Sequence, residues 1–365
     1  MAITLNKTAT ASYPRILGIR YDPAAFTLPD STRAAWDWEA NAEALQVINA
    51  AGGTVRRING ATAELSGLPQ LLASTDNQFV QQHLQNQLQG VVISLPDHAE
   101  ISPALNLTLR TESAFPVEWT VWFDLGVHSR LTTKLTLDLA GEVQQSNCLI
   151  GGALADESNL TLITDTQSHQ ATRSLLLGDF VSARDANLDW SLWPQTKGQL
   201  LGDLNVTLAG TGSRATLNLA RYGYQDDWVG IRGQIKHLGQ HTFSRINMRG
   251  VLYENSRVNF TSIGQIDHGA SDADADQESR LMTVEPHAKG SVNPVLVIDE
   301  NDVRAGHAAS VGQYDEDALY YLQSRGLPMA TAKQILIDNF MEPIWRLRNG
   351  EVDEDDGLPK FNLFG

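Results

Sequence analysis

The stretch ANLDWSLW, residues 186–193, places Leu188, Trp190 and Leu192 at every second position, with polar residues between them. An alternation with a period of two indicates a β-strand that buries one of its faces. Between about residues 91 and 304, five further segments alternate in this way: ALNLTL at 104–109, KLTLDLAG at 134–141, SNLTLITD at 158–165, GDLNVTLAG at 202–210 and RATLNLARYG at 214–223. The sequence therefore predicts a mostly β protein built from short strands.

The spacing of these strands suggests how they are arranged. Sets of alternating apolar residues recur about every 25 to 30 residues, and they are Leu135-Leu137-Leu139, Leu160-Leu162, Leu188-Trp190-Leu192 and Leu217-Leu219. Each coil of a parallel β-helix contributes one such strand to each face, with Leu, Val and Ile inside and Asn, Thr or Asp outside. A parallel β-helix is therefore favoured, and a β-sandwich stays an alternative because the repeat is imperfect.

Residues 1–95 form a different, mixed region in which we expect helices to dominate. In STRAAWDWEANAEALQVINAAGG, Ser31 is a candidate helix cap and Gly52-Gly53 a candidate stop. A second helix is predicted from the i, i+4 spacing of Val80, Leu84 and Leu88, ending at Gly90.

The pattern changes again after the β-helix core, which we place at residues 96–305. Residues 306–350 are predicted to be helical, with Asp315 as a cap, and Gly326 and Pro328 closing the first helix. A second helix follows, and Pro343 should kink or split it because proline lacks the backbone donor. Residues 351–365 form an acidic tail. Five apolar residues of the two helices either pack internally or meet a partner, and they are Leu319, Leu322, Ile335, Phe340 and Ile344.

Composition limits the classes of function. The chain has 365 residues, and its 27 basic and 43 acidic residues give a net charge of -16, which repels nucleic acids and anionic membranes. We expect neither as a partner. The N-terminal MAITLNKTATASYP lacks the apolar core of a signal peptide, and no apolar run approaches the roughly 18 residues of a membrane span. The sequence therefore predicts a cytoplasmic protein.

Motifs of catalysis and cofactor binding are weak or missing. GxxxxGK[ST], GxSxG and HExxH do not occur, and GTGSRA at 210–215 precedes strand alternation rather than the helix of a dinucleotide site. Asp272, Asp274 and Asp276 are spaced like the start of a calcium loop, but Gln277 stands at its glycine position, which favours a solvated surface loop. Cys148 is the one cysteine, so an internal disulfide and a cysteine-rich metal site are excluded. We interpret Cys148 as a small buried apolar residue, with a role in sulfur relay as the alternative.

His307 stands at the boundary between strand-like and helix-like sequence, in DVRAGHAASVGQYDEDALYYLQSRGLP, residues 302–328. Its neighbours Gly306, Ala308 and Ala309 are small and would let another backbone or a cofactor approach. This stretch and RVNFTSIGQIDHGASDADADQESRLMTVEPHAKGSVNPVLVIDENDV before it resemble the C-terminal core of the SufB/SufD family of iron–sulfur cluster assembly proteins. The segments that carry the resemblance are Gly264–Ile266, Gln277–Met282, Pro294, Asp302-Val303, HAASVGQYD and YYLQSRGL. GVVISLPDHAEISPALNLTL resembles the start of the family's β-helix.

The resemblance implies a right-handed parallel β-helix flanked by an N-terminal region and C-terminal helices. It also implies pairing with SufB through the β-helix and docking of the ATPase SufC on the C-terminal helices. The GHAASVGQYD sequence, the length and the single cysteine resemble SufD more than SufB. The isolated chain can also form a homodimer, because an exposed β-helix edge invites self-pairing.

His307 falls on the histidine of SufD that is thought to face SufB, where a transient iron–sulfur cluster assembles. The resemblance thus makes His307 a candidate cofactor-binding residue and metal ligand, with no cofactor expected in the isolated chain. Many SufD proteins carry a cysteine two residues earlier, where this chain has Ala305. Imidazole is then the one borderline-soft ligand that this chain offers at the site, and it binds iron well.

These observations predict a SufD-type scaffold subunit of the SUF machinery that is not itself an enzyme. One alternative is a β-helix polysaccharide lyase or hydrolase that uses Asp272, Asp274 and Asp276 for calcium binding or acid–base catalysis. A second alternative is a homodimer with a structural role.

Overall fold

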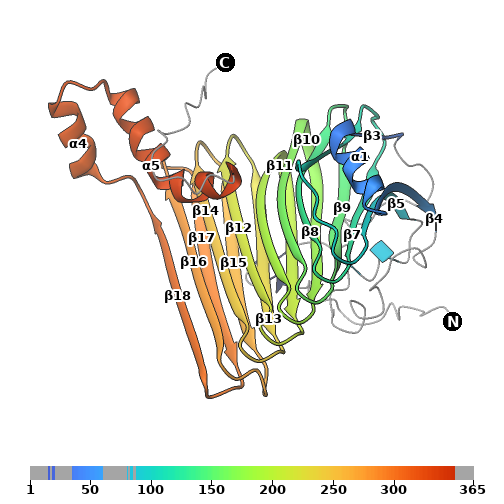
Figure 1. Ribbon diagram of the computed structural model, residues 1–365. Helices are drawn as coiled ribbons and strands as arrows, with labels where there is room; N and C mark the ends of the chain where they lie inside the picture. Colours follow the sequence, from blue (N-terminus) through green and yellow to red (C-terminus); the bar gives the residue numbers. More distant parts are fainter. Residues whose placement is uncertain are drawn as a thin grey trace, which may run out of the picture.

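The protein is a stack of β-strand coils with helices at both ends (Figure 1). The computed structural model describes residues 15–16, 19–20, 35–60, 80, 83–84 and 88–349. About 60% of the chain is strand, arranged in about 8 turns of a solenoid, which confirms the predicted mostly β class and the parallel β-helix. No helix within the described residues is both long and apolar enough to cross a membrane.

The elements follow one another in the order that the sequence periodicity suggests. The N-terminal elements are β1 (Arg15–Ile16), β2 (Ile19–Arg20), β3 (Asp37–Ala40), α1 (Ala42–Ala50) and β4 (Thr54–Gly60). The solenoid strands are β5 (Leu88–Leu95), β6 (Leu105–Thr111), β7 (Val117–Leu125), β8 (Arg130–Leu139), β9 (Gln145–Leu154), β10 (Asn159–Ser182), β11 (Asn187–Leu208), β12 (Arg214–Gly223), β13 (Trp228–His237), β14 (Phe243–Leu252), β15 (Arg257–Ile266), β16 (Ala273–Thr283), β17 (Lys289–Ile298) and β18 (Val303–Gly312). The C-terminal helices are α4 (Glu316–Ser324) and α5 (Met329–Asn349).

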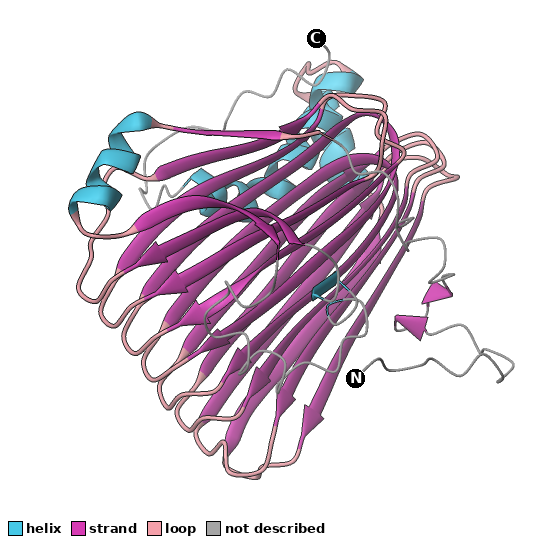
Figure 2. Ribbon diagram, turned by 90° about the vertical axis from the view of Figure 1, so that its right-hand side faces the viewer, coloured by secondary structure: helices cyan, strands magenta, loops and turns pink. Residues whose placement is uncertain are grey.

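The strands form two faces, and each strand pairs in parallel with its counterpart one coil later. One face runs through β12, β14, β16 and β18, and the other through β13, β15 and β17. β10 and β11 are long enough to take part in both faces. Figure 2 shows the strands of successive coils side by side, joined by turns at their ends. Parallel pairing between coils excludes the β-sandwich alternative, whose sheets are antiparallel.

The interior consists of ladders in which residues of successive coils stack. Leu162, Trp190, Leu217 and Ile246 are paired from coil to coil, and all four are fully buried. Stacking of this kind removes apolar surface from water at every coil, which stabilises the fold by about 25 cal/mol per Å² buried. The alternating leucines and tryptophans of the sequence are therefore the core of the solenoid.

Polar groups fix the corners of the coils. The guanidinium of Arg221 is buried, donates to the carbonyl oxygens of Pro194 (2.6 Å) and Thr196 (2.9 Å), and forms a 2.7 Å ion pair with Asp227. Asp227 in turn accepts a hydrogen bond from the backbone N–H of Gly198 at 2.8 Å. Burial lowers the pKa of Arg221 and the charge of Asp227 opposes that shift. A buried ion pair with all these partners ties neighbouring coils together.

The N-terminal region agrees with the sequence only in part. α1 ends at Ala50, with Ala51 as its C-cap, and the φ of 84° at the following Gly52 confirms the predicted stop. Its N-cap is Asn41, and Ser31 lies outside the described residues. Helical structure is found at residues 80 and 83–84, but Leu88 and Gly90 belong to β5. This part of the helix prediction is wrong because β5 pairs with β4 and β7, and tertiary pairing overrides the local i, i+4 spacing. The expectation that helices dominate residues 1–95 is also wrong for β3, which lies inside the stretch predicted as the first helix, and for β4; the other residues of this region lie largely outside the described ones.

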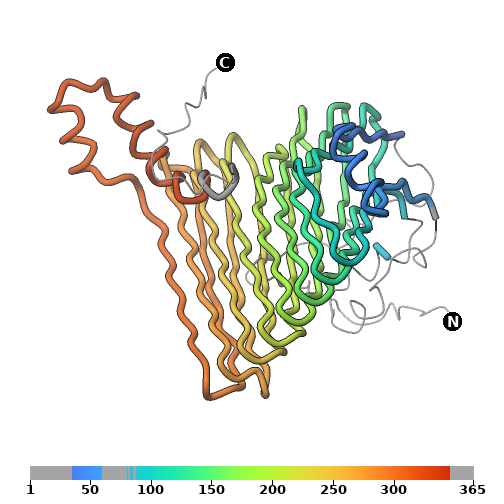
Figure 3. The backbone as a smooth tube through the Cα atoms, viewed as in Figure 1, coloured from blue at the N-terminus to red at the C-terminus, as the bar shows by residue number. Residues whose placement is uncertain are grey.

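The C-terminal boundary also differs from the prediction. β18 continues to Gly312, so the strand-to-helix change lies after Gly312 and not at 306. Asp315 caps α4 as predicted, since its carboxylate accepts hydrogen bonds from the N–H groups of Asp317 (2.9 Å) and Ala318 (3.1 Å). α5 runs past Pro343 without a break, and Figure 3 shows it changing direction along its length. The acidic tail at 351–365 lies outside the described residues.

Candidate functional site at the open end of the β-helix

The last coil of the described chain leaves two strand edges unpaired. β18 pairs only with β16, and β17 pairs only with β15. Several large apolar side chains are exposed there, and they are Val297, Ile298 and Val311, at 49%, 42% and 45%. An exposed edge with apolar side chains is a surface that natural β proteins usually cover with another element or chain. The open end is therefore the candidate interaction site.

His307 lies in the middle of β18, on the row that continues the interior. Residues Ala273, Ala275, Gln277, Ser279 and Leu281 of β16 are buried and point inward. The register places His307 directly opposite Gln277, so His307 lies on the inward-facing row of the last coil. It is nevertheless exposed, because β18 is the last strand of the described solenoid. An imidazole in this position faces whatever covers the open end.

The residues that stack from coil to coil in line with His307 change from apolar to polar toward the open end. This column is apolar through Trp190, Leu217 and Ile246, and it then continues through Gln277 to His307. On the facing strand, Ser262 lies within 3.4 Å of Ser279, measured between their hydroxyl oxygens. The positions in line with Trp190, Leu217 and Ile246 are therefore polar in the last two coils of this face.

The structure does not bring Cys148 to His307. Cys148 lies inside the solenoid on β9, and the row that contains it passes through Leu176, Gly202 and Ile231 on later coils before it nears the open end. It is buried, and burial raises the pKa of its thiol well above the ordinary range. The predicted burial of Cys148 is confirmed, and a protonated thiol is a poor nucleophile and metal ligand.

The acidic residues considered for calcium lie elsewhere than predicted. Asp274 and Asp276 are on strand β16 rather than in a loop, and Asp272 occupies the turn before it with a φ of 57°. A carboxylate oxygen of Asp272 lies 3.3 Å from Nδ1 of His241, and one of Asp276 lies 3.5 Å from Nε of Arg245. The glycines of GTGSRA form a turn that leads into β12, as their strand-like continuation predicted. Across the described chain, His, Cys, Asp and Glu side chains do not gather in threes in a way that could hold a metal ion.

The C-terminal helices divide into a docked part and a projecting part. The docked part, residues 337–345 of α5, packs on the outer surface of β12 and β14 through an apolar cluster that includes Met341, Ile344 and Trp345. α4 and the start of α5 project beyond the last coil (Figure 1). The largest exposed apolar side chains of this projecting part are Tyr320 (75%), Tyr321 (54%), Met329 (49%) and Ile335 (36%).

The five helical residues named from the sequence divide in the same way. Leu319 and Ile344 are buried, Leu322 and Phe340 are half-buried, and Ile335 is exposed. Sequence periodicity identified the apolar face but missed Tyr320 and Tyr321, which lie off that face. Their signal was present in the sequence as two adjacent aromatic residues in a capped helix.

Comparison with known proteins identifies the family. The SufBD core domain of the SUF system for iron–sulfur cluster assembly matches residues 123–340, more than half of the chain. The chain is 38% identical to the iron–sulfur cluster assembly protein SufD of Bacillus subtilis over 161 residues, which cover 44% of this chain and 37% of that protein. It is 24% identical to the SufD of Escherichia coli over 154 residues, covering 42% of this chain and 35% of the other.

The matched segments are thus little more than a third of the length of either relative. A SufBD family protein of Mycobacterium leprae is 28% identical over 155 residues, which are 42% of this chain and 16% of that protein. The match to the core domain covers the solenoid from β7 onward, the open end with His307, and the helices as far as residue 340. The chain belongs to the SufBD family of iron–sulfur cluster assembly proteins, and within it the chain is most like SufD.

Proposed function

We propose that the chain is a SufD-type scaffold subunit that assembles iron–sulfur clusters together with SufB and the ATPase SufC, and that it has no enzymatic activity of its own. The observation that carries this proposal is the open end of the β-helix, where an exposed edge strand holds His307. Family membership supports the same role. We also propose that the chain works in the cytoplasm.

The open end supports pairing with SufB. β18 has unpaired backbone donors and acceptors along one edge, and a partner strand can satisfy them by extending the sheet. The exposed Ile298 and Val311 beside it would lose contact with water in such a pairing. A transient cluster at this interface would bind His307 from this chain and further ligands from SufB. Neutral imidazole binds iron while holding a cluster with less negative charge than thiolate does, which suits a scaffold that releases its product.

The projecting helices support docking of SufC. Tyr320, Tyr321 and Met329 present apolar and aromatic surface that contributes little to the fold, and such side chains are enriched at the centres of protein interfaces. The chain itself has no phosphate-binding loop, so ATP hydrolysis would come from this partner.

The structure gives no support to the calcium site on which the polysaccharide lyase alternative was based. Asp272 and Asp276 lie beside His241 and Arg245 on the outside of the coils, where no described group of acidic residues is placed to hold calcium. The homodimer remains as a state of the isolated chain, because the same open edge can pair with a second copy.

Affinity capture tests the proposed partners. Full-length tagged chain, recovered from gently lysed cells of its own organism, should bring down SufB and SufC. The double substitution Tyr320→Ser and Tyr321→Ser should reduce SufC recovery about tenfold and leave SufB recovery unchanged, since aromatic interface residues each contribute about 1–2 kcal/mol or more. Phe115→Ser is the matched control, because Phe115 is 53% exposed on a loop between β6 and β7. Recovery of the chain alone, or only with untagged copies of itself, would contradict the scaffold proposal.

A further inference from the structure

The residue that precedes His307 in the coil-to-coil column is an amide, and the four residues before it, Leu162, Trp190, Leu217 and Ile246, are apolar. Gln277 is 1% exposed and stands between Ile246 on the preceding coil and His307 on the last coil. A buried amide is costly unless its hydrogen-bonding groups have partners. A methionine or leucine would fill the same space without that cost, so the amide calls for an explanation.

The orientation of this amide is set by the opposite face of the coil. Nε2 of Gln277 donates a 3.0 Å hydrogen bond to the carbonyl oxygen of Val295 on β17. The reversed orientation would bring the amide oxygen against that carbonyl oxygen, which is repulsive. The side-chain oxygen Oε1 is therefore the free group, and it is buried without a hydrogen-bond partner among the described residues.

His307 is the group placed to use this oxygen. Parallel strands lie about 4.8 Å apart, and side chains in register on the same face stack directly. Along β18, the residues on either side of His307 that face the same way are Ala305 and Ala309, which are small and leave the ring space to turn. The ring is exposed and so is not held by packing, and a neutral imidazole always carries one N–H donor.

We propose that Gln277 is a positioning residue for His307: its Oε1 accepts a hydrogen bond from one ring N–H, which fixes the tautomer and leaves the other ring nitrogen unprotonated and directed out of the open end. Histidines that bind metals commonly donate their second ring N–H to an oxygen acceptor in this way. The metal-binding part of this inference rests on the proposed function, whereas the tautomer does not. The free nitrogen would bind a soft or borderline metal centre presented by the partner.

The tautomer can be measured in the isolated chain. Nitrogen-15 labelled histidine in the full-length protein gives two ring signals for each residue, and the His307 pair is identified by its loss in His307→Gln. We expect the tautomer ratio of His307 to differ by about fivefold or more from that of a histidine side chain in water, the preference that one hydrogen bond supplies. In Gln277→Met, which keeps the volume and removes the acceptor, the ratio should approach that of a histidine side chain in water.

Two results would overturn the inference: a tautomer ratio in the unsubstituted chain that equals that of a histidine side chain in water, or the same ratio in Gln277→Met as in the unsubstituted chain. The first needs no substitution at Gln277, so the inference stays testable even if Gln277→Met fails to fold. Iron bound by the reconstituted complex is a separate readout, and Gln277→Met should lower iron affinity about tenfold if His307 is a ligand. If His307→Ala binds iron normally while the tautomer result holds, the ligand role fails and the positioning by Gln277 stands.

Discussion

At the scale of single residues, histidines in this protein take opposite roles according to burial. His307 is exposed on an edge strand, whereas His237, at the end of β13, is fully buried. The ring nitrogens of His237 lie 2.7 Å from the hydroxyl of Thr242 and 2.8 Å from that of Ser244. Both partners are neutral, so nothing compensates a charge on the ring, and burial lowers the pKa of His237 to about 4.

His237 makes the free energy of unfolding depend on pH. Its pKa is lower in the folded chain than the unfolded value of 6.5, so the unfolded chain binds the proton more readily. The stability contributed by the neutral ring is complete above pH 6.5 and is lost as the pH falls toward 4. The loss from this group is about 3 kcal/mol for a pKa lowered from 6.5 to about 4.

Urea unfolding between pH 7 and pH 4 checks this prediction with His237→Gln. The variant loses packing at pH 7, but the difference in unfolding free energy from the unsubstituted chain should shrink by about 3 kcal/mol at pH 4. His268→Gln is the control, because the side chain of His268 is 85% exposed. A difference that stays constant with pH would mean that His237 is not held neutral by burial.

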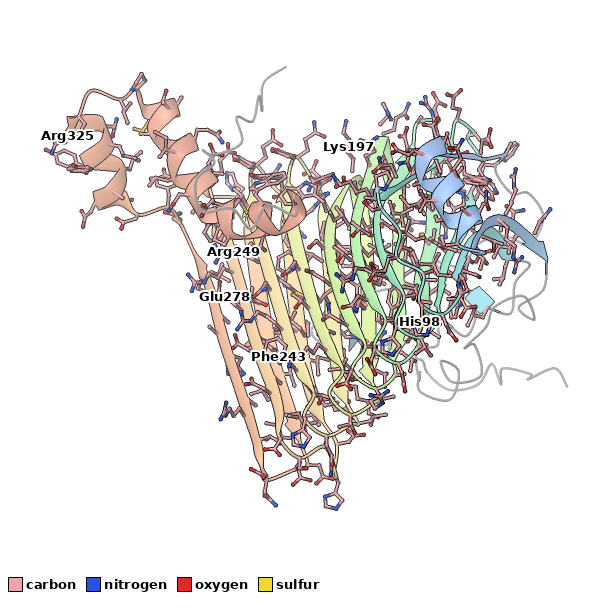
Figure 4. All side chains as sticks on the ribbon, in the orientation of Figure 1. His98, Lys197, Phe243, Arg249, Glu278 and Arg325 are labelled. Atoms are coloured by element: carbon pink, nitrogen blue, oxygen red, sulfur yellow. The ribbon has the colours of Figure 1, made fainter. Side chains whose placement is uncertain are left out.

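At the scale of elements, α5 is attached to the solenoid by aromatic packing and one arginine. The ring centroids of Trp345 and Trp193 lie 3.7 Å apart, and both rings pack beside Tyr222 of β12. Arg249 of β14 donates a 2.6 Å hydrogen bond to the carbonyl oxygen of Phe340 and another of 2.6 Å to Glu278. Figure 4 shows Arg249 directly beside α5, with Glu278 next to it on the solenoid. The C-terminal part of α5 is thus docked on the solenoid, whereas its start projects beyond the last coil together with α4.

Trp345→Ala should release this docking. Replacing a buried tryptophan by alanine typically costs about 3–5 kcal/mol of stability. We expect this loss to exceed the free energy that holds a single helix on the surface of a sheet. Hydrogen exchange of residues 337–345 should become markedly faster, while the interior strands β10 and β11 keep their protection. Tyr320→Ala, which removes a side chain that is 75% exposed, should change neither. Unchanged protection of α5 in Trp345→Ala would contradict the docking described here.

The elements also show where sequence reasoning succeeds and where it stops. Alternating residues such as Leu188, Trp190 and Leu192 predict their strand, because every second side chain is buried. The sequence predicts a helical region from residue 306 onward, but residues 306–312 belong to strand β18. The segment is a strand because β16 offers it a paired edge, a fact of tertiary structure that a local window does not contain.

At the scale of the whole molecule, the fold and the site differ in how far the sequence reveals them. The recurrence of apolar sets favours a solenoid, since each coil repeats one structural unit, but it leaves a β-sandwich as an alternative that the parallel pairing of the strands excludes. His307 was identified by resemblance and not by its own chemistry. Its place on the inward row, with Gln277 beneath it, depends on the register between β16 and β18. That register is set by the lengths of the intervening turns, which periodicity does not fix.

The two proposed interaction surfaces lie at the same end of the stack. The open edge with His307 and the projecting helices both follow the last coil, and residues 313–315 join β18 to α4. The closed core, with Trp190 and Leu217 fully buried, is suited to hold those surfaces in place.

The central claim is that His307 at the open end serves cluster assembly, and anaerobic reconstitution tests it most directly. The complex of this chain with SufB and SufC is supplied with iron and sulfide, and bound iron and the visible absorption spectrum are recorded for the unsubstituted chain, His307→Ala and the exposed-histidine control His268→Ala. We predict that His307→Ala binds clearly less iron, about tenfold less tightly, while His268→Ala matches the unsubstituted chain. Equal iron content and an identical spectrum for His307→Ala, in a complex that still forms, would contradict the claim.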